Sequence, residues 1–258
     1  MSEKARLTMP TSEDTGLAPP SDAPRVTVRA EECFNYAAWQ NSVPLIRSLT
    51  VTNPTAEDLA SLTIQLATSP AFATPKTWTI DRVEAGQQVE VRDPDIAIDA
   101  DYLERLDEAV RGTMSFRLCK DDQVLAETMH PVRVLARDEW GGMHSMGELL
   151  PAFVTPNDPA IAPLLKAAAE ALDRHGHPTA LDGYQSGDPN RAYMLAAALW
   201  SAVAAQSLTY ANPPSSFEQV GQKTRRVGTV LGDGLATCLD TTLLFASGLE
   251  AMGPNPVL

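Results

Sequence analysis

The sequence predicts a multidomain protein in which an all-β domain is followed by an α-rich domain. Between positions 25 and 138, short runs rich in Val, Ile, Thr and Leu alternate between apolar and polar residues, as half-buried strands do. Beyond position 158, the apolar residues recur at helical spacing instead. The chain has 258 residues, of which 44% are hydrophobic and 21% charged, so it can form two hydrophobic cores.

Seven runs in the first region have the length and composition of strands. They cover residues 25–30, 45–53, 59–68, 76–83, 87–93, 112–120 and 131–138. Turn-forming segments such as NPTAED, EAGQ and CKDDQ separate them. This pattern predicts an antiparallel β-sandwich of immunoglobulin-like size over residues 25–138. A helical turn is expected within residues 99–112, between two of the strands.

Two segments flank the predicted sandwich. Residues 1–24 are polar, rich in proline and aperiodic, so we expect a disordered leader there. Residues 139–158 form a predicted connector, in which Trp140 is expected to pack against the junction between the two domains.

Residues 159–258 begin with two predicted helices, and the same type of signal, an Asp-Pro pair, marks the start of each. Asp158 and Pro159 open the first helix, which is expected to stop at Gly176, although Pro163 can shift its start by a few residues. Asp188 and Pro189 open the second. In the second helix, the helical spacing predicts a core face made of Tyr193, Ala197, Trp200 and Ala204.

The last predicted helix places a cysteine at its start. Thr237 is the expected N-cap, with Asp240 as its reciprocal partner in a capping box, so Cys238 takes the first helical position. The helix is expected to end at Met252, before Gly253, and to be buried except at its N-terminus. A helix N-terminus stabilises a thiolate, and its free N–H groups can stabilise an oxyanion. Cys238 is therefore either an activated nucleophile or a small residue that suits a helix start.

Charge and cysteine content restrict the class of protein. The net charge is −13, so this segment is a poor candidate for binding nucleic acid. No transmembrane run and no secretory signal are evident, and a cytoplasmic location follows. The three cysteines do not have the spacing of a disulfide framework or a zinc site, and Cys33 and Cys119 are expected to be buried free thiols.

The order of motifs resembles a known family. The segments GQKTRR (221–226) and TCLDTTLLFASGLE (237–250) are the most specific, and VRVLARDEWGG, ELLPAFVTPNDPAI and LDGYQSGDPN precede them in the same order. From Arg25 to Leu258, the chain resembles the N-terminal region of large bacterial helicase-related proteins that are associated with phage defence. That region combines a β-sandwich with a transglutaminase-like cysteine module.

The resemblance implies the roles of several residues. Residues 159–258 would be the N-terminal helical half of a truncated transglutaminase- or papain-like (α+β) domain. Cys238 would be the nucleophile of a Cys-His-Asp triad whose His and Asp lie beyond residue 258. We therefore expect the chain to be an N-terminal fragment. ATP and Mg²⁺ are expected only for the helicase region of the parent protein, because these residues contain no GxxxxGK[ST] phosphate loop and imply no cofactor or metal of their own.

The residues around the cysteine have alternative roles. Gln222 is a candidate oxyanion donor, or else it holds the loop before the helix together with Arg225. Asp240 is interpreted as a helix cap rather than as a catalytic acid, because its charge beside the sulfur would raise the thiol pKa. The four histidines, His130, His144, His175 and His177, all precede Cys238 and are interpreted as solvated or capping residues.

Two functions follow from these observations. The first is an accessory or recognition module of a helicase-type antiviral protein, which contacts a protein partner or the remaining domains of the parent chain and is non-catalytic as this segment stands. The second is a thiol acyl-transferase or peptidase module that uses Cys238.

Overall fold

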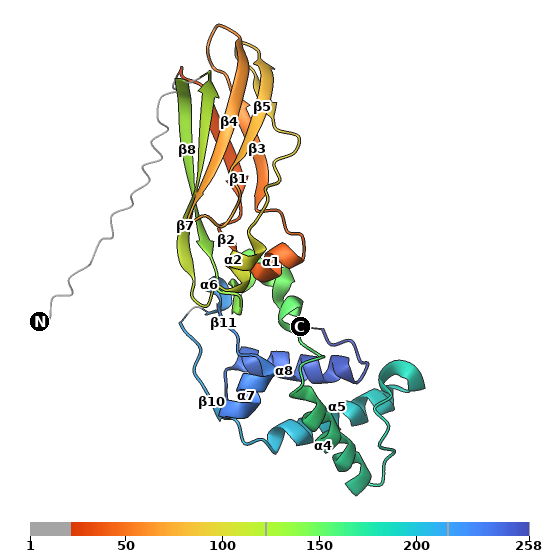
Figure 1. Cartoon of the computed structure of the whole chain (residues 1–258). Coiled ribbons are helices and arrows are strands. Elements are labelled where there is room, and N and C mark those ends of the chain that lie inside the picture. Colours follow the sequence, from red (N-terminus) through yellow and green to blue (C-terminus); the bar gives the residue numbers. More distant parts are fainter. Residues whose placement is uncertain (1–21, 122, 216, 258) are drawn as a thin grey trace, which may run out of the picture.

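The computed structural model of the protein describes residues 22–121, 123–215 and 217–257 (Figure 1). In these residues the chain has a mixed α/β fold with eight α-helices and four sheets. The predicted leader, residues 1–24, lies almost entirely outside the described residues. Sheets make up the first part of the chain, and most of the helices follow them.

Two sheets form the first part. One has the strand order β1-β3-β6 and the other β2-β8-β7-β4-β5. The strands are β1 (Arg25–Ala30), β2 (Cys33–Phe34), β3 (Ile46–Thr52), β4 (Leu59–Ser69), β5 (Lys76–Val83), β6 (Gln88–Glu90), β7 (Val110–Lys120) and β8 (Gln123–Val134). Two short helices, α1 (Tyr36–Gln40) and α2 (Ala100–Glu104), lie at one end of these sheets (Figure 1).

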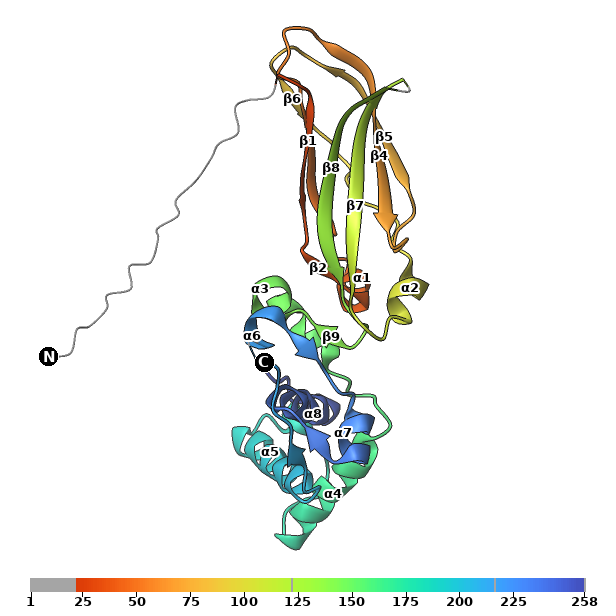
Figure 2. The same cartoon turned by 90° about the vertical axis from the view of Figure 1, so that its left-hand side faces the viewer.

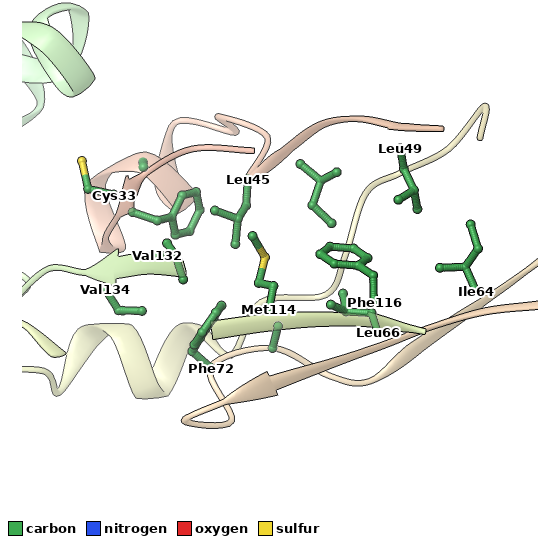
Figure 3. Close-up of a cluster of buried hydrophobic side chains, with 14 of the residues drawn as sticks. Cys33, Leu45, Leu49, Ile64, Leu66, Phe72, Met114, Phe116, Val132 and Val134 are labelled. Atoms are coloured by element: carbon green, nitrogen blue, oxygen red, sulfur yellow. The ribbon is translucent and has the colours of Figure 1, made fainter. Parts of the chain in front are cut away.

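Side chains of both sheets meet in one core, because the strands alternate buried and more exposed residues. In β4, Leu62, Ile64 and Leu66 are buried and separated by more exposed residues. They share a cluster with Leu49 of β3 and Phe116 of β7 (Figure 3). Burying such side chains stabilises the fold by about 1.5–3 kcal/mol each.

Each of the seven predicted strands corresponds to an observed one, but β6 covers only 88–90 of the predicted 87–93, and β8 ends at 134 rather than 138. Strand β8 begins at Gln123, well before the predicted 131, because it pairs with β7 along almost its whole length. Helix α1 and strand β2 were not predicted. Asn35 explains the start of α1, since its side chain accepts a hydrogen bond from the Ala38 N–H at 3.0 Å. The predicted helical turn is present as α2.

The predicted connector contains regular structure. It forms β9 (Glu139–Trp140), α3 (Gly142–Met146) and the 3₁₀ helix η1 (Gly147–Phe153). Trp140 is buried, as expected, and its Nε1 donates a hydrogen bond to the Met146 carbonyl at 2.9 Å. Strand β9 pairs with a strand more than eighty residues later, so this segment ties the two parts of the chain together.

Helices dominate the second part (Figure 2). The elements are α4 (Ile161–Arg174), the 3₁₀ helix η2 (Gly183–Ser186), α5 (Pro189–Ala204), β10 (Thr209–Tyr210), α6 (Phe217–Val220), β11 (Gln222–Lys223), α7 (Val227–Asp233), β12 (Leu235–Ala236) and α8 (Cys238–Ala251). Strand β10 pairs in parallel with β12, and β11 pairs antiparallel with β9. Asp188 caps α5, as predicted. Helix α4 starts at Ile161, two residues later than Pro159.

The predicted core face of α5 is wrong. Tyr193, Ala197, Trp200 and Ala204 are exposed, and the opposite face carries the buried residues, including Leu195, Leu199 and Val203. Helix α5 is apolar around most of its circumference, so spacing alone does not identify the face that packs. Leucine and valine fill the core, while the larger aromatic side chains point outward.

Helix α8 belongs to both hydrophobic cores. Leu239 and Leu243 pack in the cluster formed by the sheets, whereas Leu244 and Met252 pack in the cluster formed by α4 and α5. Gly248 brings α8 close to α5, since a Cβ at this position would lie 2.8 Å from a side-chain carbon of Leu199. The helix therefore connects the two parts of the protein through its own side chains.

Candidate functional site

The N-terminus of α8 presents Cys238, which is exposed. Both halves of the capping box are formed. The Thr237 Oγ1 accepts a hydrogen bond from the Asp240 N–H at 3.2 Å, and the Asp240 carboxylate accepts one from the Thr237 N–H at 2.9 Å. The helix start is thereby fixed, and the thiol lies at the positive end of the helix dipole.

Arg225, which lies between β11 and α7, holds the carboxylate of Asp240. Its backbone N–H donates to Asp240 Oδ1 at 2.7 Å, and its Nη1 donates to Oδ2 at 2.8 Å. The Asp240 side chain is fully buried, so these bonds and the one from Thr237 compensate its charge. This geometry fits the loop-positioning role of Arg225 and the cap role of Asp240.

Gln222 reaches the same cap from β11. Its side chain is buried, and its Nε2 donates to Thr237 Oγ1 at 3.2 Å. Its Oε1 is buried without a hydrogen-bond partner among the described residues. Gly221 makes this placement possible, because it has a φ of +82° and a Cβ there would lie 1.8 Å from the Trp140 carbonyl oxygen.

The four histidines lie elsewhere. His130 is on β8, with its Nε2 3.4 Å from the Glu31 carbonyl oxygen, and His144 is on α3. His175 follows α4, where its Nδ1 lies 2.8 Å from the Ala171 carbonyl oxygen, and His177 is exposed nearby. Within residues 22–121, 123–215 and 217–257, no histidine is hydrogen-bonded to Cys238. The structure thus groups Cys238 with Gln222, Arg225, Thr237 and Asp240, and no described histidine joins them.

The other two cysteines are buried and unpaired, as predicted. Burial raises the pKa of the Cys33 thiol, and a hydrogen bond with Ser145 and the charge of Arg133 only partly offset it. A buried protonated thiol is a poor nucleophile, so the exposed Cys238 is the candidate for thiol chemistry.

A cavity that sequence reasoning missed lies beside this cap. It has a volume of about 230 Å³, and its lining includes Arg137, Asp138, Arg225, Arg226 and Leu243. The adjacent positively charged residues of GQKTRR were a sequence signal for this cavity. Arg137 and Asp138, which also line it, lie some ninety residues earlier in the chain. Only the folded chain brings the two segments together.

The described part of the chain holds no group of three or more His, Cys, Asp or Glu side chains placed to bind a metal ion. None of its helices combines the length and apolar character needed to span a bilayer.

Comparison of the chain with protein-family models gives no match, and comparison with curated proteins gives none either. The candidate site therefore rests on its geometry and on the resemblance of its motifs.

Proposed function

We propose that this chain is the N-terminal recognition portion of a large bacterial helicase-type protein of antiviral defence, cytoplasmic and non-catalytic as it stands. In this proposal the two facing sheets are an immunoglobulin-like sandwich. The helices that follow are part of a transglutaminase-like domain, which the resemblance of GQKTRR and TCLDTTLLFASGLE suggests. The parent protein would use ATP and Mg²⁺ in a helicase region beyond these residues.

The observation that carries the recognition role is the apolar outer face of α5. Tyr193 is 76% exposed and Trp200 64% exposed, and the Trp200 ring stacks on Phe245 of α8 with a centroid distance of 5.3 Å. Large exposed aromatic side chains on one face are typical of protein interfaces.

Two hollows flank these aromatic residues. One of about 350 Å³ lies between α4 and α5 beside Tyr193, and one of about 270 Å³ lies beside Trp200 and Tyr210. Among the described residues that line the two hollows, none is Asp, Glu, Lys or Arg. A face of this kind suits the apolar surface of a protein partner, either another domain of the parent chain or a separate protein. Nucleic acid is a poor ligand for a segment of net charge −13.

The test uses the complete gene in a bacterial host challenged with phage. We expect the gene to continue past codon 258 into helicase motifs, and a stop codon there would contradict the parent assignment. Tyr193→Ser and Trp200→Ser should abolish protection, while Cys238→Ser should retain it. Met129→Ser, which removes an exposed apolar side chain from β8, is the matched control. Protection that survives both α5 variants would exclude recognition through this face.

A second function is favoured by the environment of Cys238. The exposed thiol at the start of a capped helix, with the Gln222 amide nearby, fits thiol acyl transfer or peptide hydrolysis. The Cys238 thiolate would attack an acyl carbon and form a thioester. A histidine supplied beyond residue 258 would accept the thiol proton and return it to the leaving amine. An aspartate beyond residue 258 would orient that histidine.

This alternative makes the opposite prediction for the same experiment. Cys238→Ser would abolish protection, and the α5 variants would retain it. The isolated chain should show no turnover of acyl substrates in either case, because it places no base at the thiol in its described residues. Alkylation by iodoacetamide at neutral pH separates the two functions further. A rate no higher than that of an unstructured cysteine peptide would argue against an activated thiol.

A further inference from the structure

The cavity beside the α8 cap lies between the two parts of the protein. Its lining includes α1 and η1 from one side and the segment 224–227 from the other. A second hollow of about 410 Å³ adjoins it, and the two share Arg137, Asp138, Thr224, Arg225 and Arg226. Small-molecule sites often form at such junctions.

The walls of this cavity are held rigidly. The Thr224 backbone N–H donates to the Asp138 carbonyl at 2.7 Å, and its Oγ1 donates to the same oxygen at 2.9 Å. Strands β9 and β11 pair directly next to these residues. Asp138 and the segment 224–226 are therefore fixed relative to each other without a ligand.

Most of the charges at the cavity are already compensated. Arg225 pairs with Asp240 at 2.8 Å, Lys223 with Glu108 at 2.6 Å, and Arg137 more loosely with Glu104 at 3.7 Å. Glu108 is the main cause of the raised pKa of Lys223, to which Asp138 and Glu139 contribute less.

Two opposite charges remain. Across the residues that the structure describes, the Arg226 guanidinium and the Asp138 carboxylate have no hydrogen bond and no ion pair, and they do not pair with each other. Both line the cavity and the adjoining hollow. A cation and an anion that face one cavity without pairing suit a ligand that carries both charges.

Apolar side chains also line the cavity, beside the polar Gln40, Thr155 and Thr224. Tyr36 of α1, Phe153 of η1 and Leu243 of α8 are among these apolar side chains. A volume of about 230 Å³ corresponds to roughly eight water molecules, which is close to the size of an aliphatic amino acid.

We propose that this cavity binds a free α-amino acid with an apolar side chain. The carboxylate is held by Arg226, with the N–H groups of Arg137 and Arg225 that remain free after their ion pairs. The ammonium group is held by Asp138, and the side chain packs against Tyr36, Phe153 and Leu243. This site is separate from Cys238 and does not depend on the recognition role of α5.

The test is a titration of the ¹⁵N-labelled chain with L-leucine, followed by amide chemical shifts. We expect saturable shifts in residues 137–138 and 224–227, with a Kd of about 1 mM. N-acetyl-L-leucine lacks the ammonium group and L-leucinamide lacks the carboxylate. Each should bind roughly tenfold more weakly, because one charge-assisted contact is lost.

Two variants and a control complete the test. Arg226→Gln should weaken the binding of L-leucine by roughly tenfold and reduce the preference over L-leucinamide, because Arg137 and Arg225 alone then face the carboxylate. Asp138→Asn should do the same for the preference over N-acetyl-L-leucine. Arg92→Gln replaces an exposed arginine that is not among the described residues lining either hollow, and it should change nothing. All three sites are at least partly exposed, so the variants should fold. Absent shifts, equal binding of the three probes, or an unchanged affinity in Arg226→Gln would overturn the proposal.

Discussion

Arg225 binds Asp240 through two separate groups, its backbone N–H at 2.7 Å and its guanidinium Nη1 at 2.8 Å. The segment between β11 and α7 and the first turn of α8 are thereby joined at one buried carboxylate. The same arginine lines the cavity between the two parts of the protein. Its position thus links the cap beside Cys238 to the proposed ligand site.

Removing that carboxylate should destabilise the protein. Asp240→Ala loses the capping box and leaves Arg225 without its partner, and we expect the free energy of unfolding to fall by about 2 kcal/mol. Urea denaturation measures it. Glu250→Ala removes an exposed carboxylate from the same helix and should change stability by no more than about 0.5 kcal/mol. Equal effects of the two variants would contradict the role given to Asp240.

The close approach of α5 and α8 predicts an unusual response to alanine. Gly248→Ala places a methyl group 2.8 Å from the fully buried Leu199 side chain, so we expect a loss of about 1–2 kcal/mol despite the better helix propensity. Gly232→Ala in α7 meets nothing within 4 Å and should be neutral or stabilising by up to about 1 kcal/mol. Thermal unfolding of both variants compares them directly, and a stabilising Gly248→Ala would show that the packing is looser.

The three thiols should differ in native alkylation. Iodoacetamide at neutral pH should modify Cys238, because it is exposed, and spare Cys119 and Cys33, because both are buried and burial raises the pKa of the Cys33 thiol. Peptide mass spectrometry locates the label. In Cys238→Ser, the native protein should incorporate almost no label until denaturant is added. Early labelling of Cys33 would indicate that the junction around Trp140 opens.

Acid should weaken the contact that holds the segment before α5. The Arg191 Nε donates to Asp182 at 2.7 Å, and this bond lowers the pKa of the Asp182 carboxyl. Such a group stabilises the fold above its unfolded pKa, and its contribution is lost as the pH falls through the lowered folded value. Asp182→Asn should therefore reduce the loss of stability on acidification below about pH 4.

Asp173→Asn, at an exposed carboxyl that forms no ion pair in the described structure, is the control. Denaturation midpoints between neutral and acidic pH compare the variants, and an unchanged pH profile in Asp182→Asn would refute the assignment.

Local sequence signals were sufficient to predict the strands and the helix starts. The strands of the sheets followed from alternation in segments such as β4, and the starts of α5 and α8 followed from Asp188 and Thr237. These features depend on neighbours within a few residues, so the sequence contains the whole cause.

Features that depend on distant segments were not predictable. The outward face of α5 was misassigned because alanine and leucine lie on several sides of the helix, and packing against α4 and α8 decides which side is buried. The cavity near Arg226 needs the β9–β11 pairing, which joins residues more than eighty positions apart. Neither arrangement has a periodic signature in the sequence.

Helix α8 couples the stability of the two parts of the protein. Because Leu243 and Leu244 are neighbours in sequence but sit in different cores, a disturbance that melts either core withdraws support from the other. We expect one cooperative unfolding transition rather than two. A chain that ends before α8 should leave apolar surface of the sheet part exposed to solvent.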